Sequence, residues 1–438
     1  MTTDDGLTDR PTLRRFIADG VFALCAGWLL YLISGELVAP LAEAKGFGLN
    51  WLAMSRDPAA LVGPFPHRIL APALAWATGC GGDGYLSFTQ GLHVLLLAST
   101  CLVVLRLRGN YLDALLVGLA IAITAPTQMY KLHWVGYTDP ICYTLFLWAI
   151  VASRNPHVFW LLFLLNLFNH ELAGFLLPWL FLLRRCADRR WQLDLIWIGV
   201  TCGLYLAFYL YVKSTAQNQQ YNFDYFLKYP LFPGGSFAVV NLALVHLVTA
   251  FGPLLAVIAW HQHSGVSLVE RLHLWLVLLG VLVIFAIAFD WARHSNLLML
   301  PLVVAAVRFL RGGGRYRLAF AGLIGLTLML FWLVPPWASS AWPTNDIVEG
   351  PPQWRLERNP NGDPTKKLMF QSGLVVLIPT PDGLNFGFGP LSAALTGWLP
   401  VVWKILATCH LIGGLYWIVG WLLARTRLLP PRTPIPAA

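Results

Sequence analysis

Apolar stretches long enough to cross a lipid bilayer recur along the whole chain. A helix needs about 20 apolar residues to span the hydrocarbon core, and residues 16–34, 85–105, 193–212 and 237–260 are among the stretches close to or above this length. Hydrophobic residues make up 57% of the 438 positions and charged residues only 12%, which is more apolar surface than a water-soluble fold can bury. We therefore expect an all-α, polytopic integral membrane protein with about 12 helices.

The positive charges are unevenly distributed along this chain, whose formal net charge is +9. More than half of its 30 basic residues are arginines at the termini or at alternate connections: Arg10, Arg14, Arg15, Arg106, Arg108, Arg154, Arg184, Arg185, Arg189, Arg190, Arg271, Arg308, Arg311, Arg315, Arg317, Arg425, Arg427 and Arg432. Basic residues accumulate in the cytoplasmic connections of membrane proteins. The pattern predicts cytoplasmic termini in a bacterial inner (plasma) membrane, and it explains the net charge without a nucleic-acid partner.

Three regions follow from this topology. Residues 1–334 form the expected transmembrane domain, with a first outer loop at 35–84. Residues 335–395 are polar and rich in proline and glycine, and we expect an extracytoplasmic loop there. Residues 396–438 are expected to form a final transmembrane helix and a cytoplasmic tail.

Several central helices are predicted to be shorter than a full span, namely 140–153, 157–168 and 172–183. Two arrangements are open: half-penetrating segments around a cavity, or one fused span with the polar residues 169–171 buried inside it. The first is preferred, because it keeps the arginines at 154 and 184–190 on one side of the membrane. Short spans are tolerated where protein or water covers their ends.

The first outer loop concentrates ionisable groups between two long apolar segments. Residues 55–74 read S-R-D-P-A-A-L-V-G-P-F-P-H-R-I-L-A-P-A-L, and they include Arg56, Asp57, His67 and Arg68. The prolines prevent a regular helix and leave a stiff loop. From Ile69 onward the apolar residues fall at helical spacing, which predicts a helix along the outer membrane surface.

Ionisable residues from separate connections fall on the outer face in this topology: Arg56, Asp57, His67, Arg68, Lys131, His133, Asp139, His170, Glu171, Asp290, Arg293 and His294. Such residues at membrane depth are costly and usually functional, so we expect them to line one pocket. The structural alternatives are an N-cap for Asp139, buried ion pairs for His170 with Glu171 and for Asp290 with Arg293, and interfacial positions for His133 and His294. For Asp57 and Arg68 a purely structural role is less favoured than a functional one.

These residue types suit the transfer of a sugar from a lipid phosphate. A carboxylate can take the proton of an acceptor hydroxyl, an arginine fork can bind the leaving phosphate, and histidine or lysine can assist with its developing charge. The expected catalytic carboxylates are Asp57, as the base, with Asp139 and Glu171. The expected substrate and phosphate ligands are Arg56, His67, Arg68, Lys131, His133, His170, Asp290, Arg293 and His294, with Arg68, Lys131 and Arg293 on the phosphate.

No cofactor is expected. The seven cysteines are scattered and include no C-x-x-C pair, so neither a disulfide framework nor a zinc site is indicated. A divalent metal is compatible with the chemistry, but no motif indicates one.

The pattern resembles the C-type glycosyltransferase (GT-C) superfamily, polytopic enzymes that take sugars from polyprenyl-phosphate donors at the outer membrane face. The resemblance rests on Asp57 in the first outer loop, the surface helix after it, the short central helices, N-H-E at 169–171 and D-W-A-R at 290–293. It implies a catalytic domain over residues 1–334. It also implies a polyprenyl-phosphate-linked sugar, membrane lipid, and a glycan, lipid or protein acceptor as partners.

The chain departs from that superfamily in two respects. Arg56 stands beside Asp57 where many members carry paired acids, and the outer C-terminal segment lacks a W-W-D-Y-G-like signature, which argues against oligosaccharyltransferase activity. A transporter or flippase of a lipid-linked or anionic substrate is the main alternative function, and an acyltransferase built on His133 or His170 is a third. The inner charges are nearly all arginines at helix ends, which favours the enzyme over a transport pathway.

Overall fold

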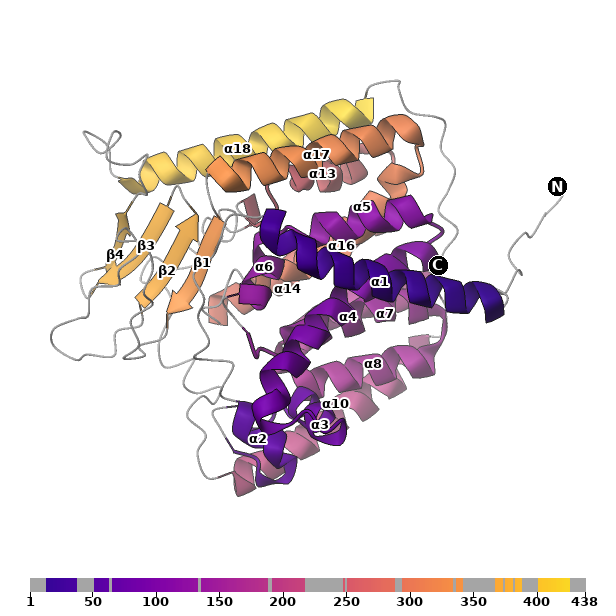
Figure 1. Cartoon of the computed structure of the whole chain (residues 1–438), viewed down its shortest axis with the longest axis vertical. Coiled ribbons are helices and arrows are strands. Elements are labelled where there is room, and N and C mark those ends of the chain that lie inside the picture. The colour runs from indigo at the N-terminus through magenta and orange to yellow at the C-terminus, as the bar shows by residue number, and fades with distance from the viewer. Residues whose placement is uncertain are drawn as a thin grey trace.

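The computed structural model describes residues 13–37, 51–62, 65–132, 135–187, 191–216, 247–248, 250–287, 294–333, 336–341, 367–372, 375–380, 383–387 and 401–425. Within these ranges the chain is predominantly helical, which confirms the helical character expected from the sequence (Figure 1). The helices pack side by side, and a small sheet lies at one end of them.

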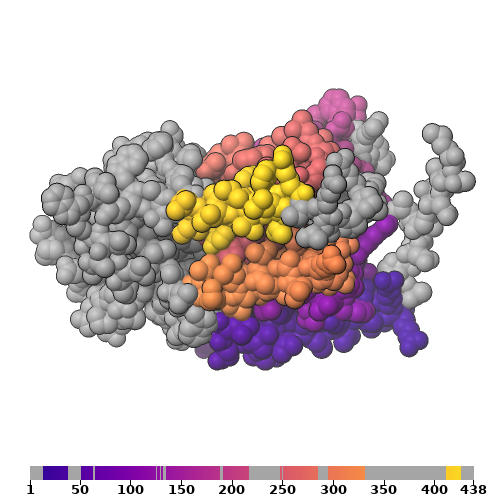
Figure 2. Space-filling view, turned by 90° about the horizontal axis from the view of Figure 1, so that it is seen from above, coloured from indigo at the N-terminus to yellow at the C-terminus, as the bar shows by residue number. Residues whose placement is uncertain are grey.

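The N-terminal half of the chain contributes helices α1 (Leu13–Leu37), α2 (Leu52–Arg56), α3 (Leu70–Ala77), α4 (Tyr85–Arg106), α5 (Tyr111–Ala122), α6 (Ala125–Leu132), α7 (Asp139–Val151), α8 (Pro156–Asn169), α9 (Leu177–Ala187) and α10 (Trp191–Thr215). The C-terminal half contributes α13 (Leu255–His263), α14 (Leu268–Ile287), α16 (Met299–Leu310), α17 (Gly314–Leu333) and α18 (Val401–Arg425). The 3₁₀ turns are η2 (Pro58–Ala60), η3 (Gly82–Gly84), η4 (Ala152–Arg154), η5 (Glu171–Leu176), η6 (Gly252–Leu254) and η7 (Asn296–Leu298). Helices α17 and α18 lie next to each other on the face shown in Figure 2.

Three helical segments of the described chain are long and apolar enough to cross a membrane: Leu13–Leu37, Gly82–Arg106 and Trp191–Thr215. Helix α10 has the surface that lipid favours, because Ile196, Leu204 and Leu210 are 62%, 52% and 55% exposed. These helices indicate a membrane protein. The count of about 12 helices, the kind of membrane and the orientation of the termini stay predictions.

Glycines allow close contact between three of the N-terminal helices. A Cβ atom at Gly27 of α1 would lie 2.6 Å from the backbone nitrogen of Ala98 in α4. A Cβ atom at Gly118 of α5 would lie 2.7 Å from both Cys101 Sγ and Leu30 Cδ1. Membrane helices pack closely where small residues let their backbones approach, so these positions hold α1, α4 and α5 together.

Arginine–carboxylate pairs connect the helices at one end. The pairs are Arg106–Asp19 at 3.3 Å, Arg184–Asp194 at 2.9 Å, Arg308–Glu270 at 3.1 Å and Arg317–Asp113 at 2.7 Å. Two further contacts join them across the fold, from Arg311 Nη2 to the Leu107 carbonyl at 2.5 Å and from Cys186 Sγ to His273 Nε2 at 3.6 Å. We call this side of the molecule the arginine end. It gathers many of the arginines that the charge pattern assigned to one side.

The short central helices are present, and they reverse direction as the preferred arrangement requires. Asn155 ends one connection by capping α8, since its Oδ1 accepts from the backbone N–H of His157 at 3.1 Å and of Val158 at 3.3 Å. At the arginine end Arg184 of α9 donates to the carbonyl of Ser153 in η4. Residues 153 and 184 therefore lie on the same side, and α8 and α9 are separated by the η5 turn.

The segment expected to be only a polar loop contains four strands. Strands β1 (Pro336–Ala341), β2 (Lys367–Ser372), β3 (Val375–Thr380) and β4 (Gly383–Gly387) form an antiparallel sheet in the order β1-β2-β3-β4. Ser372 pairs with Val375 and Thr380 with Gly383, so two-residue connections join β2 to β3 and β3 to β4. The expectation of an all-α chain therefore has to be extended by this sheet. Its local signals are the apolar run V-V-L-I, which is rich in β-branched residues, and the turn sequence P-D-G.

The buried pair of Arg184 and Asp194 gives a test of the arginine end. Both side chains are 0% exposed, and Asp194 Oδ1 also accepts from Trp160 Nε1 at 2.9 Å. We expect Asp194→Asn to lower the free energy of unfolding by about 3–5 kcal/mol, because it removes the carboxylate that faces a buried guanidinium. Urea unfolding in detergent measures this. The control is Asp83→Asn, whose side chain is 95% exposed and which should have little effect; equal effects of the two variants would contradict the assignment.

Candidate active site

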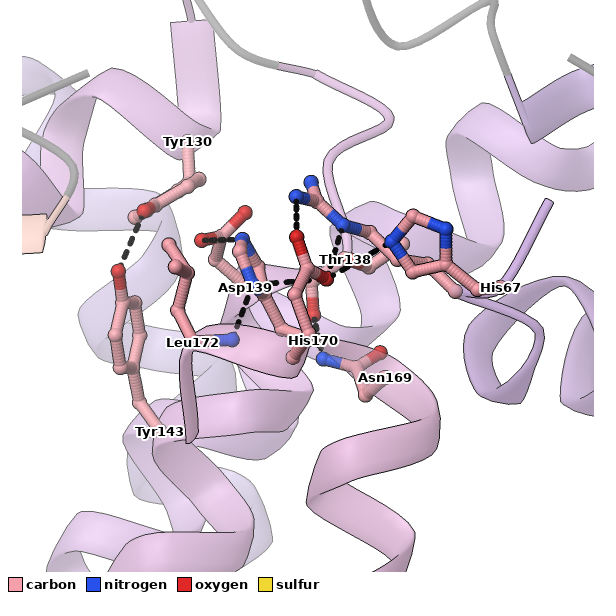
Figure 3. A network of polar contacts seen from close by, with 10 residues as sticks. His67, Tyr130, Thr138, Asp139, Tyr143, Asn169, His170 and Leu172 are labelled. Carbon is pink, nitrogen blue, oxygen red and sulfur yellow. Dashed lines mark hydrogen bonds and ion pairs between the residues drawn. The ribbon is translucent and has the colours of Figure 1, made fainter. Parts of the chain in front are cut away.

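Acidic and basic side chains from three separate connections meet at the end of the fold opposite the arginine end. His67 and Arg68 precede α3, Asp139 begins α7, and His170 and Glu171 join α8 to η5. We call these five residues the acid–base cluster (Figure 3). They come from positions up to 104 residues apart in the chain, and all five were predicted site residues.

The backbone between α8 and η5 explains how His170 and Glu171 enter the cluster. His170 is extended, with φ −159° and ψ 114°, so α8 ends at Asn169 and the chain turns. The side chain of His170 then caps η5 by accepting from the Leu172 N–H at 3.3 Å. Asn169 anchors the turn to the start of α7, because its Nδ2 donates to the Thr138 carbonyl at 3.0 Å.

The Glu171 carboxylate is the centre of the cluster. Arg68 donates to both of its oxygens, from Nε to Oε2 at 2.9 Å and from Nη2 to Oε1 at 2.5 Å. His67 Nε2 lies 3.2 Å from Oε2. The side chain of Arg68 is 5% exposed, whereas that of Glu171 is 29% exposed. Glu171 is therefore the acid of the cluster that incoming molecules can reach.

The surroundings of Glu171 keep it ionised. Burial by itself would raise the pKa of this carboxyl, but the charges of Arg68, His67 and His170, with the His67 contact, hold the pKa well below its usual range. A carboxylate held in this way is a weak base at neutral pH. It becomes a stronger base only when the positive charge of Arg68 is paired with another anion.

His170 lies between the two carboxylates. Its Nδ1 is 3.6 Å from Glu171 Oε2, and its Nε2 is 3.9 Å from Asp139 Oδ1. Because Nδ1 accepts the Leu172 N–H, a neutral His170 carries its proton on Nε2, on the side of Asp139. Asp139 is 3% exposed and lies in the first turn of α7, after Thr138 at the N-cap position. A negative charge is favoured there by the helix dipole.

Aromatic side chains close the cluster on two sides. The guanidinium of Arg68 lies 4.1 Å from the centre of the Phe65 ring, and His67 packs edge-on against Tyr209 with ring centres 5.6 Å apart. The hydroxyl of Tyr205 is buried and has no hydrogen-bond partner among the described residues, and the charges of Glu171 and Arg68 act on it. Sequence reasoning missed Tyr205 and Tyr209. Their spacing of four places them on one face of α10, but the same spacing is ordinary for aromatic residues facing lipid.

Tyr85 is a further residue that was missed. Its side chain is fully buried, its hydroxyl has no hydrogen-bond partner in the part of the chain that the structure describes, and the charge of Asp139 acts on it. Nothing in the sequence distinguishes this tyrosine from other residues at the start of an apolar helix. Only the packing of α4 against α7 brings it near the acid.

Three of the other predicted site residues, Arg56, Asp57 and Lys131, lie apart from the cluster. Arg56 pairs with Asp83 at 2.7 Å on the surface. Asp57 is exposed and caps η2, with Oδ1 accepting from the Ala59 N–H at 3.0 Å. Lys131 donates from Nζ to the Tyr31 carbonyl of α1 at 2.5 Å.

His294 joins the cluster from the C-terminal half. It is 4% exposed, and its ring packs edge-on against His170 with centres 5.7 Å apart. His133, Asp290 and Arg293 lie outside the described residues. Among the residues that are described, no three histidine, cysteine, aspartate or glutamate side chains are placed to hold a metal ion together.

Comparison of the chain with protein-family models, with curated proteins and with solved structures finds no match. The resemblance to the GT-C superfamily therefore stays a prediction, and the functional argument has to be made from the site itself.

The lowered pKa of Glu171 predicts how stability depends on pH. A carboxyl whose pKa is lower in the folded state stabilises the fold fully above its unfolded value, near 4.5, and loses that contribution as the pH falls through the folded value. We expect the free energy of unfolding of the wild type to fall as the pH is lowered below about 4.5. Glu171→Gln should reduce this loss, and Asp83→Asn should not. Identical pH profiles for the wild type and Glu171→Gln, measured by urea unfolding in detergent, would contradict the ion pairing of Glu171.

Proposed function

We propose that this chain is an integral membrane glycosyltransferase that moves a sugar from a polyprenyl-phosphate donor to a glycan, lipid or protein acceptor. The proposal places the acid–base cluster at the outer membrane face and the arginine end in the cytoplasm. The observation that carries it is the contact of Arg68 with both oxygens of a partly exposed carboxylate, Glu171. The fork of donors that holds this carboxylate also fits two oxygens of a phosphate.

The chemistry begins with an exchange of partners at Arg68. The donor phosphate takes the Nε and Nη2 donors of Arg68, and Glu171 moves toward the opening where its side chain is already exposed. Without Arg68 the pKa of Glu171 rises toward its ordinary value, because the largest opposing charge is gone. Binding of the donor thus produces the base.

Sugar transfer then needs one bond to form and one to break. The acceptor hydroxyl oxygen attacks the anomeric carbon while Glu171 takes its proton. The bond from that carbon to the phosphate oxygen breaks, and the phosphate leaves with the electron pair, held by Arg68 and His67. The products are the glycosylated acceptor, the polyprenyl phosphate and a protonated Glu171, which then returns its proton to water.

Asp139 and His170 have a positioning role in this scheme. The Nε2 proton of His170 faces Asp139, which leaves Nδ1 free of a proton to accept the Leu172 N–H. This hydrogen bond fixes the turn that carries Glu171. Asn169 holds the same turn by donating a hydrogen bond to the Thr138 carbonyl. The base is thereby carried on a connection held at two points.

The structure supports Glu171 more strongly than Asp57 as the base. The Glu171 carboxylate lies beside a phosphate-compatible arginine, whereas one Asp57 oxygen is used to cap η2 on the surface. Lys131 is engaged with α1, so Arg68 and His67 are the better phosphate ligands within the described cluster.

Sugar transfer from labelled polyprenyl-phosphate donors tests the proposal in membranes. We expect Glu171→Gln to lower kcat about 100-fold or more, since it removes the base, and Arg68→Gln to raise KM for the donor because it removes the phosphate fork. Asp83→Asn is the matched control, being an outer-face carboxylate paired with an arginine, and it should keep full activity.

Two results would count against this assignment. If Glu171→Gln kept full activity and Asp57→Asn lost it, the base would be Asp57 and not Glu171. Movement of the labelled lipid across reconstituted vesicles with no sugar transfer to any acceptor would favour a flippase.

A further inference from the structure

We infer that Arg108 and Arg311, at the arginine end, form a binding site for the phosphate group of an anionic phospholipid. The two residues follow the last turns of α4 and α16. The site is separate from the acid–base cluster, and it does not depend on the reaction proposed there.

Four of the arginines at this end face a carboxylate, whereas Arg108 and Arg311 lie near each other at adjoining helix ends. Arg106, Arg184, Arg308 and Arg317 each face a carboxylate. Neither Arg108 nor Arg311 has a carboxylate partner among the residues that the structure describes. Both side chains are exposed and able to receive a ligand.

The backbone brings the two arginines together. Arg108 has φ +66°, in the left-handed region that ends a helix, and the neighbouring N–H groups of Arg108 and Gly109 close α4 on the carbonyls of Leu105 and Val104 at 3.1 and 2.9 Å. Arg311 reaches the same helix end, donating to the Leu107 carbonyl. Partial burial of Arg311, followed by the positive charges of Arg108 and Arg308, lowers the pKa of its guanidinium group.

Local charges offset this cluster only in part. Arg108, Arg308 and Arg311 carry one positive charge each, and Glu270 offsets the charge of Arg308. The C-terminal ends of α4 and α16 add about half a negative charge each, and the N-terminal ends of α5 and α17 beside them add about half a positive charge each. A positive charge is left over, which a phosphodiester group can offset.

The position of the site favours a lipid over free phosphate. Arg108 lies just beyond the membrane-length apolar segment that ends at Arg106, which is the depth of a phospholipid headgroup. Leu112 of α5 and Leu318 of α17 are 53% and 76% exposed beside the same end, and α5, α16 and α17 contact one another (Figure 1). Acyl chains can cover these leucines while the phosphate binds the arginines.

Native mass spectrometry of the full chain in detergent tests the site, with phosphatidylglycerol, phosphatidylcholine and inorganic phosphate as the probes. We expect phosphatidylglycerol to bind in preference to phosphatidylcholine, and inorganic phosphate to compete poorly. The double variant Arg108→Gln, Arg311→Gln should weaken the binding of phosphatidylglycerol about 30-fold. Arg425→Gln is the control, because it removes one exposed arginine of another helix end, stacked on Trp421, and should leave the affinity unchanged.

The alternatives give different results. Equal binding of the two lipids, or an unchanged affinity in the double variant, would overturn the site. Full competition by inorganic phosphate would show a general anion site and overturn the assignment to a lipid. If the double variant does not fold, Arg108→Gln and Arg108→Lys replace it, with the lysine variant expected to keep most of the affinity and the glutamine variant to lose it.

Discussion

A charge that leaves water needs an opposite charge beside it, and this requirement organises both ends of the fold. In a chain with 57% hydrophobic residues, an unpaired buried ion would cost several kcal/mol. At the arginine end the solution is a set of one-to-one pairs such as Arg184 with Asp194, in which both partners are buried. At the other end one carboxylate, that of Glu171, contacts Arg68 and two histidines. These paired charges are structural, whereas the acid–base cluster has a partly exposed acid with several basic groups around it.

The second arrangement is suited to change during a reaction. In the proposed reaction a substrate phosphate would compete with Glu171 for the two donors of Arg68, which bind the carboxylate in this structure. An arginine that would otherwise be buried with no counter-charge is stabilised in this way. The same contact lowers the pKa of Glu171, and in the proposed reaction substrate binding removes this effect. In the proposed mechanism, this ion pair links the stability of the fold to the activation of the base.

The sequence predicted which residues belong to the cluster better than how they pair. Local patterns were sufficient for the proline-rich loop with His67 and Arg68, for the short central helices and for the polar turn at His170 and Glu171. The partnership of Arg68 with Glu171 joins positions 103 residues apart, and no local pattern specifies such a contact. The catalytic role of Asp57 stays a prediction, because an exposed aspartate that caps a 3₁₀ turn gives the same sequence signal as a catalytic loop acid. The four-stranded sheet was missed because its strands are short and lie within a segment that composition describes as a loop.

The central claim is that Arg68 and Glu171 depend on each other, and a double-mutant cycle measures this directly. Unfolding free energies in detergent would be determined for the wild type, Arg68→Gln, Glu171→Gln and the double variant. The account predicts a coupling energy of about 1–3 kcal/mol, because each single variant leaves the other group without its main partner. Effects that add to within about 0.5 kcal/mol would show that the two side chains do not interact, and the proposed site would lose its basis.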